Sequence, residues 1–122
     1  MTKKEIFNHI IETCAHVCNV EVSEIINACR KEDVCTARAI LVFWCDAAGF
    51  TSESLAKLCE CNNAQSINAV RQRIETLWVE RYAFHLLVFD VGARLHEIAL
   101  NNGCDFDMYV PLKRIAKATG KY

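Results

Sequence analysis

The stretch Val34-Cys-Thr-Ala-Arg-Ala-Ile-Leu-Val-Phe-Trp-Cys-Asp-Ala-Ala48 decides the fold of this chain. Every side chain from Ala39 to Cys45 is apolar, and several are β-branched, so the run by itself fits a buried strand as well as a buried helix. No second convincing strand exists in the sequence to pair with it. We therefore expect a central buried helix over residues 34–48, with Gly49 as its C-cap.

Amphipathic helices are expected before this stretch. Residues 3–18 repeat apolar side chains every three to four positions, which predicts a helix that stops at Asn19. A short helix is expected to start at Ser23, because its hydroxyl can accept from the unpaired amides of a first turn. The charged residues 30–33 then read as a connection to the central helix.

A short helix, a turn and a longer helix follow the central stretch. Thr51 is expected to cap the short helix, with Glu53 in the first turn, where the helix dipole favours an anion. Residues 60–63 read as a polar turn, and Asn63 can cap the helix that opens at Ala64. Residues 51–74 therefore have the form of a helix-turn-helix, in which the start of the second helix enters the DNA major groove.

From Ile67 to Ile98 apolar residues alternate by three and four positions, with Arg81 as the single polar member. This seam fits one long helix or two helices that break near Arg81. It either packs back on the first helix and closes the core, or forms a homodimer interface through residues 78–98. Arg81 fits a helix break or a polar pair that sets the register of a dimer. The interface candidates, most of them in a second apolar row with Leu86, are Trp78, Tyr82, Phe84 and Phe89.

Composition supports an all-α fold. The chain has 122 residues, a net charge of −1, one Pro and four Gly, which is too little turn-forming sequence for a β-sandwich. We expect one compact helical domain over residues 1–103, with a helix-turn-helix and a long C-terminal helix or helix pair. Residues 104–122 form a basic tail, at most with a short helix.

Eight cysteines are compatible with disulfides, a metal site or a packed core. No secretory signal follows Met1, and the apolar runs are too short to span a bilayer, so we expect a cytoplasmic protein with reduced thiols and no membrane contact. Most cysteines fall within apolar stripes, where a thiol behaves as a small hydrophobe. No zinc spacing, catalytic set or phosphate loop is recognisable, so the sequence predicts no metal, no cofactor and no enzyme.

Four segments occur in a distinctive order: Val20-Glu-Val-Ser-Glu-Ile-Ile26, Val34-Cys-Thr-Ala-Arg-Ala-Ile40, Leu55-Ala-Lys57 and Ser66-Ile-Asn-Ala-Val-Arg-Gln-Arg-Ile-Glu75. In order and spacing, the chain from about residue 17 to about residue 77 resembles the C-terminal DNA-binding domain of the bacterial replication initiator DnaA. That domain has a Trp-repressor-like helix-turn-helix. The resemblance implies a small protein that binds double-stranded DNA, of regulatory or replication-associated type.

The candidate DNA-binding residues follow from the helix-turn-helix pattern and from the cations around it. Asn and Gln side chains can pair with adenine through two hydrogen bonds, and Arg and Lys can contact phosphates. The candidate base-reading residues are Asn62, Asn63, Gln65, Ser66 and Asn68. The candidate phosphate contacts are Arg38, Lys57 and Arg71, with Arg73 as a further cation.

The sequence departs from the family at its recognition segment. The family's Arg-Asp-His-Thr-Thr corresponds here to Asn62-Asn-Ala-Gln-Ser66, and the family's basic loop corresponds to residues 30–33, which include Glu32 and Asp33. Binding to nucleic acid depends strongly on positive charge, and this chain is nearly neutral. An alternative is therefore a non-enzymatic protein–protein interaction module that kept the fold and lost DNA binding.

Overall fold

The computed structural model describes residues 2–27, 30–59 and 64–101, and over these residues the protein is all-α, as predicted. The predicted turn at residues 60–63 and the basic tail at 104–122 lie outside the described residues. Within the described ranges there is no strand. The elements are α1 (Lys3–Cys18), α2 (Val22–Ile26), α3 (Glu32–Ala47), α4 (Ser52–Leu58), α5 (Ala64–Glu80) and α6 (Tyr82–Asn101).

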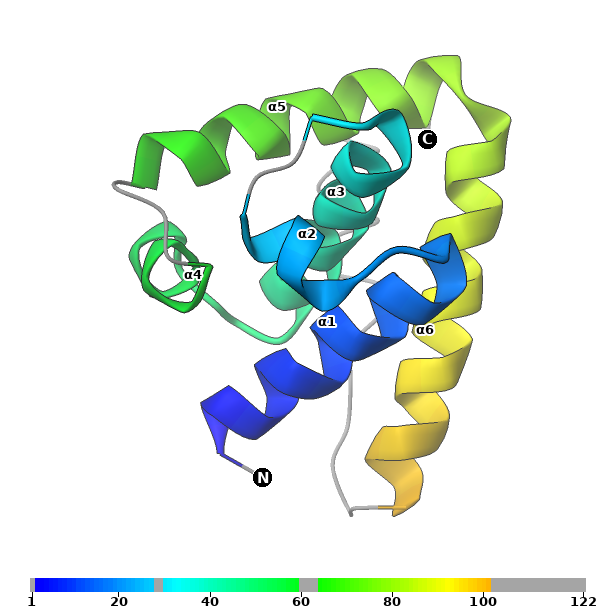
Figure 1. The fold of residues 1–122 in the computed structure, drawn as a ribbon. Coiled ribbons are helices and arrows are strands. Elements are labelled where there is room, and N and C mark those ends of the chain that lie inside the picture. The colour runs from blue at the N-terminus through cyan, green and yellow to red at the C-terminus, as the bar shows by residue number, and fades with distance from the viewer. Residues whose placement is uncertain (1, 28–29, 60–63, 102–122) are drawn as a thin grey trace.

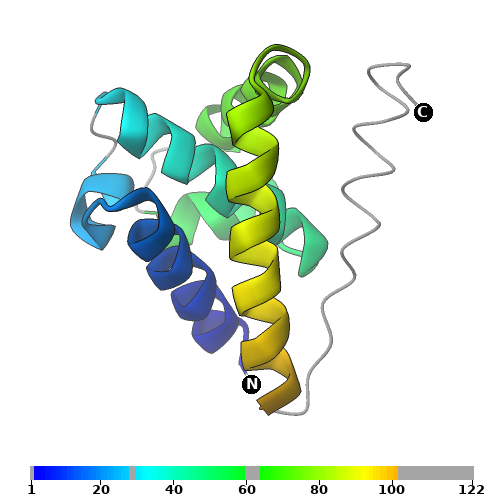
Figure 2. The same ribbon diagram turned by 90° about the vertical axis from the view of Figure 1, so that its right-hand side faces the viewer.

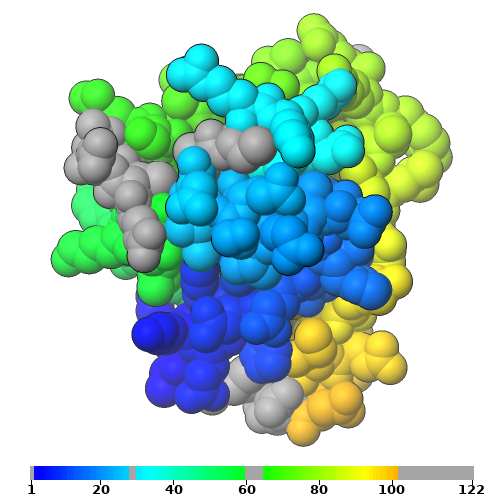
Figure 3. All heavy atoms as spheres, in the orientation of Figure 1, coloured from blue at the N-terminus to red at the C-terminus, as the bar shows by residue number. Residues whose placement is uncertain are grey.

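Helix α3 lies at the centre of the molecule, and α1, α2, α5 and α6 pack against it (Figure 1). Every side chain from Ala39 to Cys45 is buried, which confirms the prediction of a central buried helix. On the side seen in Figure 3, α1 and α2 cover the middle of α3, and its first turn reaches the surface at the upper edge. The apolar run can be helical because neighbours cover it on all sides.

The ends of the helices follow local capping chemistry. Thr51 Oγ1 accepts from the Ser54 amide at the start of α4, as predicted, and Asn19 ends α1 in the left-handed region with φ 55°. Gly49 follows the C-cap of α3 with φ 86°. The Phe50 amide there donates to the Cys45 carbonyl at 3.0 Å, as in a Schellman motif.

Two predicted helix starts are wrong. Helix α2 begins at Val22 after Glu21, whose amide donates to the Glu24 carboxylate at 3.1 Å, so Ser23 is not the cap. Helix α3 begins at Glu32, so Glu32 and Asp33 belong to its first turn and not to a connection. The two starts differ in their chemistry: Glu21 and Glu24 form a capping box at α2, whereas α3 has no side-chain cap and its Glu32 and Asp33 complement the helix dipole.

The seam from Ile67 to Ile98 forms two helices that break at Arg81, one of the two predicted alternatives. Helix α5 crosses the top of the molecule and α6 descends along its side (Figure 1), so that α6 faces the viewer in Figure 2. The seam packs into the core of the same chain, as the intramolecular alternative predicted. Its buried members are Ile67, Ile74, Leu77, Phe84, Val88, Val91 and Leu95.

Gly92 of α6 lies in close contact with the Trp44 side chain of α3. The Trp44 indole lies against this residue, and its Nε1 donates to the Val88 carbonyl at 3.0 Å. A Cβ atom placed on Gly92 would lie 2.8 Å from Trp44 Cη2 and closer still to Cζ2. Glycine is therefore needed here for close packing, although it lowers helix propensity.

Cys14, Cys45 and Cys59 are buried, so the described cysteines largely serve as core side chains, in line with the sequence prediction. Burial raises the pKa of the Cys14 and Cys45 thiols well above the ordinary value. Burial, with a smaller contribution from Asp33, raises the pKa of Cys18 from 9.0 to about 11. Among the described helices, none is long and apolar enough to cross a membrane.

We expect Gly92→Ala to lower the free energy of unfolding by about 1–3 kcal/mol, because overpacking against Trp44 outweighs the gain in helix propensity. Urea unfolding followed by circular dichroism measures the change. The matched comparison is the same substitution in a Trp44→Phe background. There the smaller ring removes the clash, so Gly92→Ala should lower the free energy of unfolding by less. An equal or larger cost in that background would contradict the proposed contact.

We expect the free energy of unfolding to fall as the pH rises from about 7 to about 10. The unfolded chain loses its thiol protons near pH 9, while the folded protein holds them because of the raised pKa of Cys14, Cys18 and Cys45. Unfolding therefore releases protons at alkaline pH and becomes easier. Urea titrations in reducing buffer test this, and a Cys14→Ala, Cys45→Ala variant should lose less stability over the same range.

Candidate nucleic-acid interface

Helices α4 and α5 are the predicted helix-turn-helix elements, and they pack against each other at one end of the molecule (Figure 1). The predicted base-reading residues Asn62 and Asn63 lie outside the described residues. Gln65 and Ser66 lie in the first turn of α5, and both are exposed. The described part of this unit therefore presents polar side chains to solvent at the start of its longer helix.

Arg71 fixes this helix pair to the end of α3. Its Nε lies 3.1 Å from both carboxylate oxygens of Asp46, and its Nη2 lies 2.5 Å from Oδ1. Its Nη1 donates to the Ser52 hydroxyl at the start of α4. The two charged side chains are mostly buried, with exposed fractions of 27% for Arg71 and 12% for Asp46. Such a two-pronged ion pair is strong and geometrically specific.

Asn68 belongs to the same network. Its Oδ1 accepts from the Ser52 hydroxyl at 2.8 Å and from Arg71 Nη1 at 3.2 Å. Arg71 and Asn68, both predicted to contact DNA, therefore have structural partners inside the protein. Asp46 and Ser52 were not predicted as members of this network, because neither lies in the second helix of the helix-turn-helix. The available signal was Asp46, an acidic residue in an otherwise apolar stretch.

Arg38 also has a structural role. Its Nη2 and Nε donate to the carbonyl of Ile25, at 2.8 and 3.2 Å, so it ties α3 to the last turn of α2. A carbonyl oxygen left without a partner at a helix end is satisfied in this way. Because a carbonyl is neutral, the bond leaves the positive charge of Arg38 in place.

A groove of about 700 Å³ runs between α3 and α5, and three arginines line it. Arg38 comes from α3, Arg73 from the middle of α5, and Arg81 from the residue between α5 and α6. Arg81 forms an ion pair with Glu32, while Arg73 is exposed. Gln65, Ala69, Gln72 and Thr76 lie on one face of α5 by helical spacing, and the last three line the groove. The polar start of α5 and the groove thus share one surface.

Lys57, in the last turn of α4, is exposed. Over the described residues of α4 and α5 with their flanks (51–59 and 64–80), three cations stand against three carboxylates. Glu80 also lines the groove and Arg81 is paired with Glu32, so the small surplus of positive charge in the groove comes from Arg38 and Arg73.

The four interface candidates separate into two pairs. Trp78 and Phe84 are 5% and 2% exposed, so they face the core and their rings meet edge to face at 6.3 Å. Tyr82 and Phe89 are 75% and 43% exposed. Only the second pair lies on the surface of the chain.

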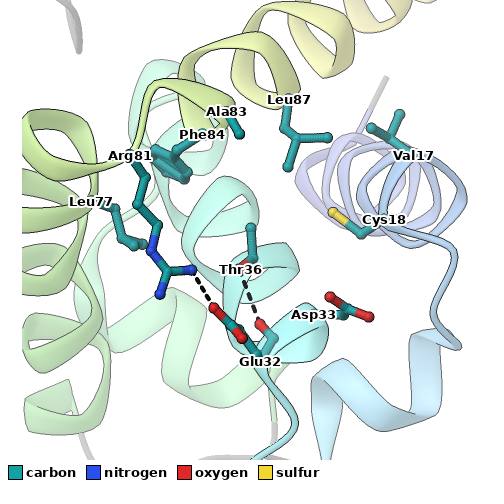
Figure 4. A pocket seen from close by; sticks show the side chains of 10 residues that line it. All are labelled: Val17, Cys18, Glu32, Asp33, Thr36, Leu77, Arg81, Ala83, Phe84 and Leu87. Carbon is teal, nitrogen blue, oxygen red and sulfur yellow. Dashed lines mark hydrogen bonds and ion pairs between the residues drawn. The ribbon is translucent and has the colours of Figure 1, made fainter.

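A second pocket, of about 340 Å³, lies at the corner between α5 and α6 (Figure 4). Val17, Leu77 and Leu87 line it together with Phe84, and the Arg81–Glu32 ion pair lies at its side. The Thr36 hydroxyl donates to the Glu32 carbonyl at 3.0 Å. Cys18 and Asp33 also line this pocket, and burial together with Asp33 raises the pKa of Cys18 to about 11, so its thiol stays protonated at neutral pH.

No group of three or more His, Cys, Asp and Glu side chains capable of holding a metal ion occurs in the part of the chain that the structure describes. Comparisons with protein-family models, with curated proteins and with solved structures gave no match for this chain. The resemblance to the initiator domain over residues 17–77 therefore stays a prediction.

We expect Asp46→Asn to lower the free energy of unfolding by about 1–3 kcal/mol, because it leaves the mostly buried Arg71 guanidinium without its counter-charge. The matched control is Asp90→Asn, which removes an exposed i,i+4 partner of Arg94 and should cost no more than about 0.5 kcal/mol. Chemical denaturation of both variants makes the comparison. Equal costs would show that the Arg71 network does not hold α4 and α5 in place.

Proposed function

We propose that this protein binds double-stranded DNA without catalysis, in a regulatory or replication-associated role, through the face shared by the start of α5 and the α3–α5 groove. The observation that carries the proposal is the continuity of that face: exposed Gln65 stands on the same side of α5 as the groove lined by Arg38 and Arg73. A duplex needs this combination, because cations position the phosphates and polar side chains read the bases.

The internal network supports the same proposal. Arg71 and Asn68 hold α4 across α5, so the first turn of α5 is presented on a fixed support. A recognition helix must be held in a defined orientation to enter the major groove. Within this arrangement we assign Gln65 to the base edges, and Lys57 and Arg73 to phosphates on either side of it. The helix order predicted by the initiator resemblance is consistent with this assignment.

We expect the protein to bind random duplex DNA at about 20 mM salt with a dissociation constant of roughly 1–100 µM. Fluorescence anisotropy at several salt concentrations measures both affinity and salt dependence. Arg73→Ala should weaken binding similarly for all sequences and reduce the slope of log K against log salt by about 1, because one phosphate contact is lost. Lys57→Ala should behave in the same way.

The control is Lys4→Ala, which removes the same charge from the exposed first turn of α1, outside the residues that line the groove. It should leave affinity and slope within experimental error of the unmodified protein. Absence of binding at about 100 µM protein and low salt would overturn the proposal. An equal effect of Lys4→Ala would assign any binding to net charge and contradict the proposed face.

A second candidate function, a protein–protein interaction module, is favoured by a different observation. The outer side of α6 exposes large apolar side chains, among them Tyr82 and Leu86, at 75% and 56%. Contiguous apolar side chains on a surface mark an interaction site. This candidate predicts no DNA binding in the titration above, together with an assembly that depends on α6.

A further inference from the structure

We propose that the outer face of α6 pairs with the α6 of a second copy of this chain, antiparallel, to form a homodimer. This inference does not rest on DNA binding. It starts from the exposed apolar side of α6 and names the partner that covers it. The evidence is the spacing, the exposure and the self-complementarity of one row of side chains, which we call the outer row.

The outer row has the spacing of a coiled-coil seam. Its members follow one another by four, three, four, three and four residues, the alternation that keeps a row of side chains facing a partner helix. It is separate from the buried seam, which lies on the opposite side of α6 and includes Val88 and Leu95. The outer row consists of Tyr82, Leu86, Phe89, Ala93, His96 and Leu100.

All six members are exposed. The four large ones, Tyr82, Leu86, Phe89 and Leu100, are 75%, 56%, 43% and 62% exposed. In Figure 2 α6 runs down the front of the molecule, and no other described helix lies over it. A surface helix of a monomer normally turns polar residues outward, whereas α6 carries an apolar stripe on its outer side as well as on its buried side. The outer stripe can be buried only against a partner.

The outer row is complementary to itself when the two helices run antiparallel. With the two-fold axis at the level of Val91, Phe89 lies opposite the partner's Ala93. At the same axis Leu86 lies opposite the partner's His96, and Tyr82 opposite the partner's Leu100. Large and small side chains then alternate across the central layer, as close packing requires. A parallel pair would place Phe89 against itself and Ala93 against itself, leaving a clash beside a gap.

Charge does not decide between partners at this register. Asp90 and Arg94 form an ion pair within the helix, with Arg94 Nε 3.1 Å from Asp90 Oδ1. With the axis at Val91, each Asp90 lies two residues along the helix from both the partner's Arg94 and the partner's Asp90, so attraction and repulsion across the interface offset each other. The self-complementarity of the outer row in side-chain size is what selects a second copy of this chain as the occupant.

The dimer leaves α4 and the start of α5 uncovered, because they lie at the other side of the molecule from α6 (Figure 1). Dimerisation and DNA binding are therefore tested by different variants. Failure of one proposal leaves the other standing.

The experiment is sedimentation equilibrium of the full chain from about 5 µM to about 500 µM. We expect the apparent mass to rise from the monomer mass of 13.8 kDa toward twice that value. Leu86→Asp should raise the dimer dissociation constant at least about tenfold, because a carboxylate would be buried between the two outer rows. Val79→Asp is the matched control: Val79 is 51% exposed at the end of α5, outside the outer row, and should change the constant less than about twofold.

A size swap tests the antiparallel pairing itself. Phe89→Ala alone and Ala93→Phe alone should each weaken the dimer, by a gap and by a clash respectively. The double variant Phe89→Ala, Ala93→Phe should recover most of the affinity, because each layer again pairs one large with one small side chain. Circular dichroism confirms that each variant is folded.

Three results would overturn the proposal. A monomer throughout the concentration range would mean that a second copy does not cover the outer row. The occupant would then be the basic segment 104–122 or another protein. A dimer that tolerates Leu86→Asp would place the interface elsewhere. A swap variant weaker than both single variants would exclude the antiparallel register.

Discussion

The burial of α3 on all sides between Ala39 and Cys45 is the constraint on which the rest of this structure depends. A helical segment with no polar face can be stable only where other helices cover it, and here α1, α2, α5 and α6 pack against α3. Its Trp44 reaches α6 and donates to the Val88 carbonyl, and Gly92 lets the two helices approach. The places of α5 and α6, and hence the surfaces they expose, follow from the need to cover α3.

In a chain with a net charge of −1, the cations are divided between structure and surface. Arg71 holds α4 and α5 to Asp46, and Arg81 pairs with Glu32 at the break between α5 and α6. Arg38 donates to a neutral carbonyl and so keeps its charge available beside Arg73. The charge of the candidate DNA face therefore depends on which partner each arginine has. The net charge of the chain does not reveal those partners.

Local sequence signals predicted the helices well where a single residue decides. Thr51, Asn19 and Gly49 mark helix ends by their own hydrogen bonding or backbone preference. The prediction failed at two helix starts. Helix α2 begins before Ser23, with a capping box made by Glu21 and Glu24, and α3 begins at Glu32, in a stretch that was predicted to be a connection. Of the candidate site, the position of Gln65 and Ser66 on an exposed first turn agrees with the sequence analysis. The internal partners of Asn68 and Arg71 were not predictable, because Asp46 and Ser52 are 16 to 25 residues away.

The sequence by itself determined that this protein is all-α and that its central helix is buried, because apolar periodicity and capping are local properties of the chain. Only the tertiary structure decided which side of each helix is covered. Trp78 and Phe84 belong to the same apolar pattern as Tyr82 and Phe89, yet the first two face the core and the last two face solvent. Helical spacing defines the faces of a helix but not their neighbours, and α6 has two apolar faces, of which α1 and α3 cover only one.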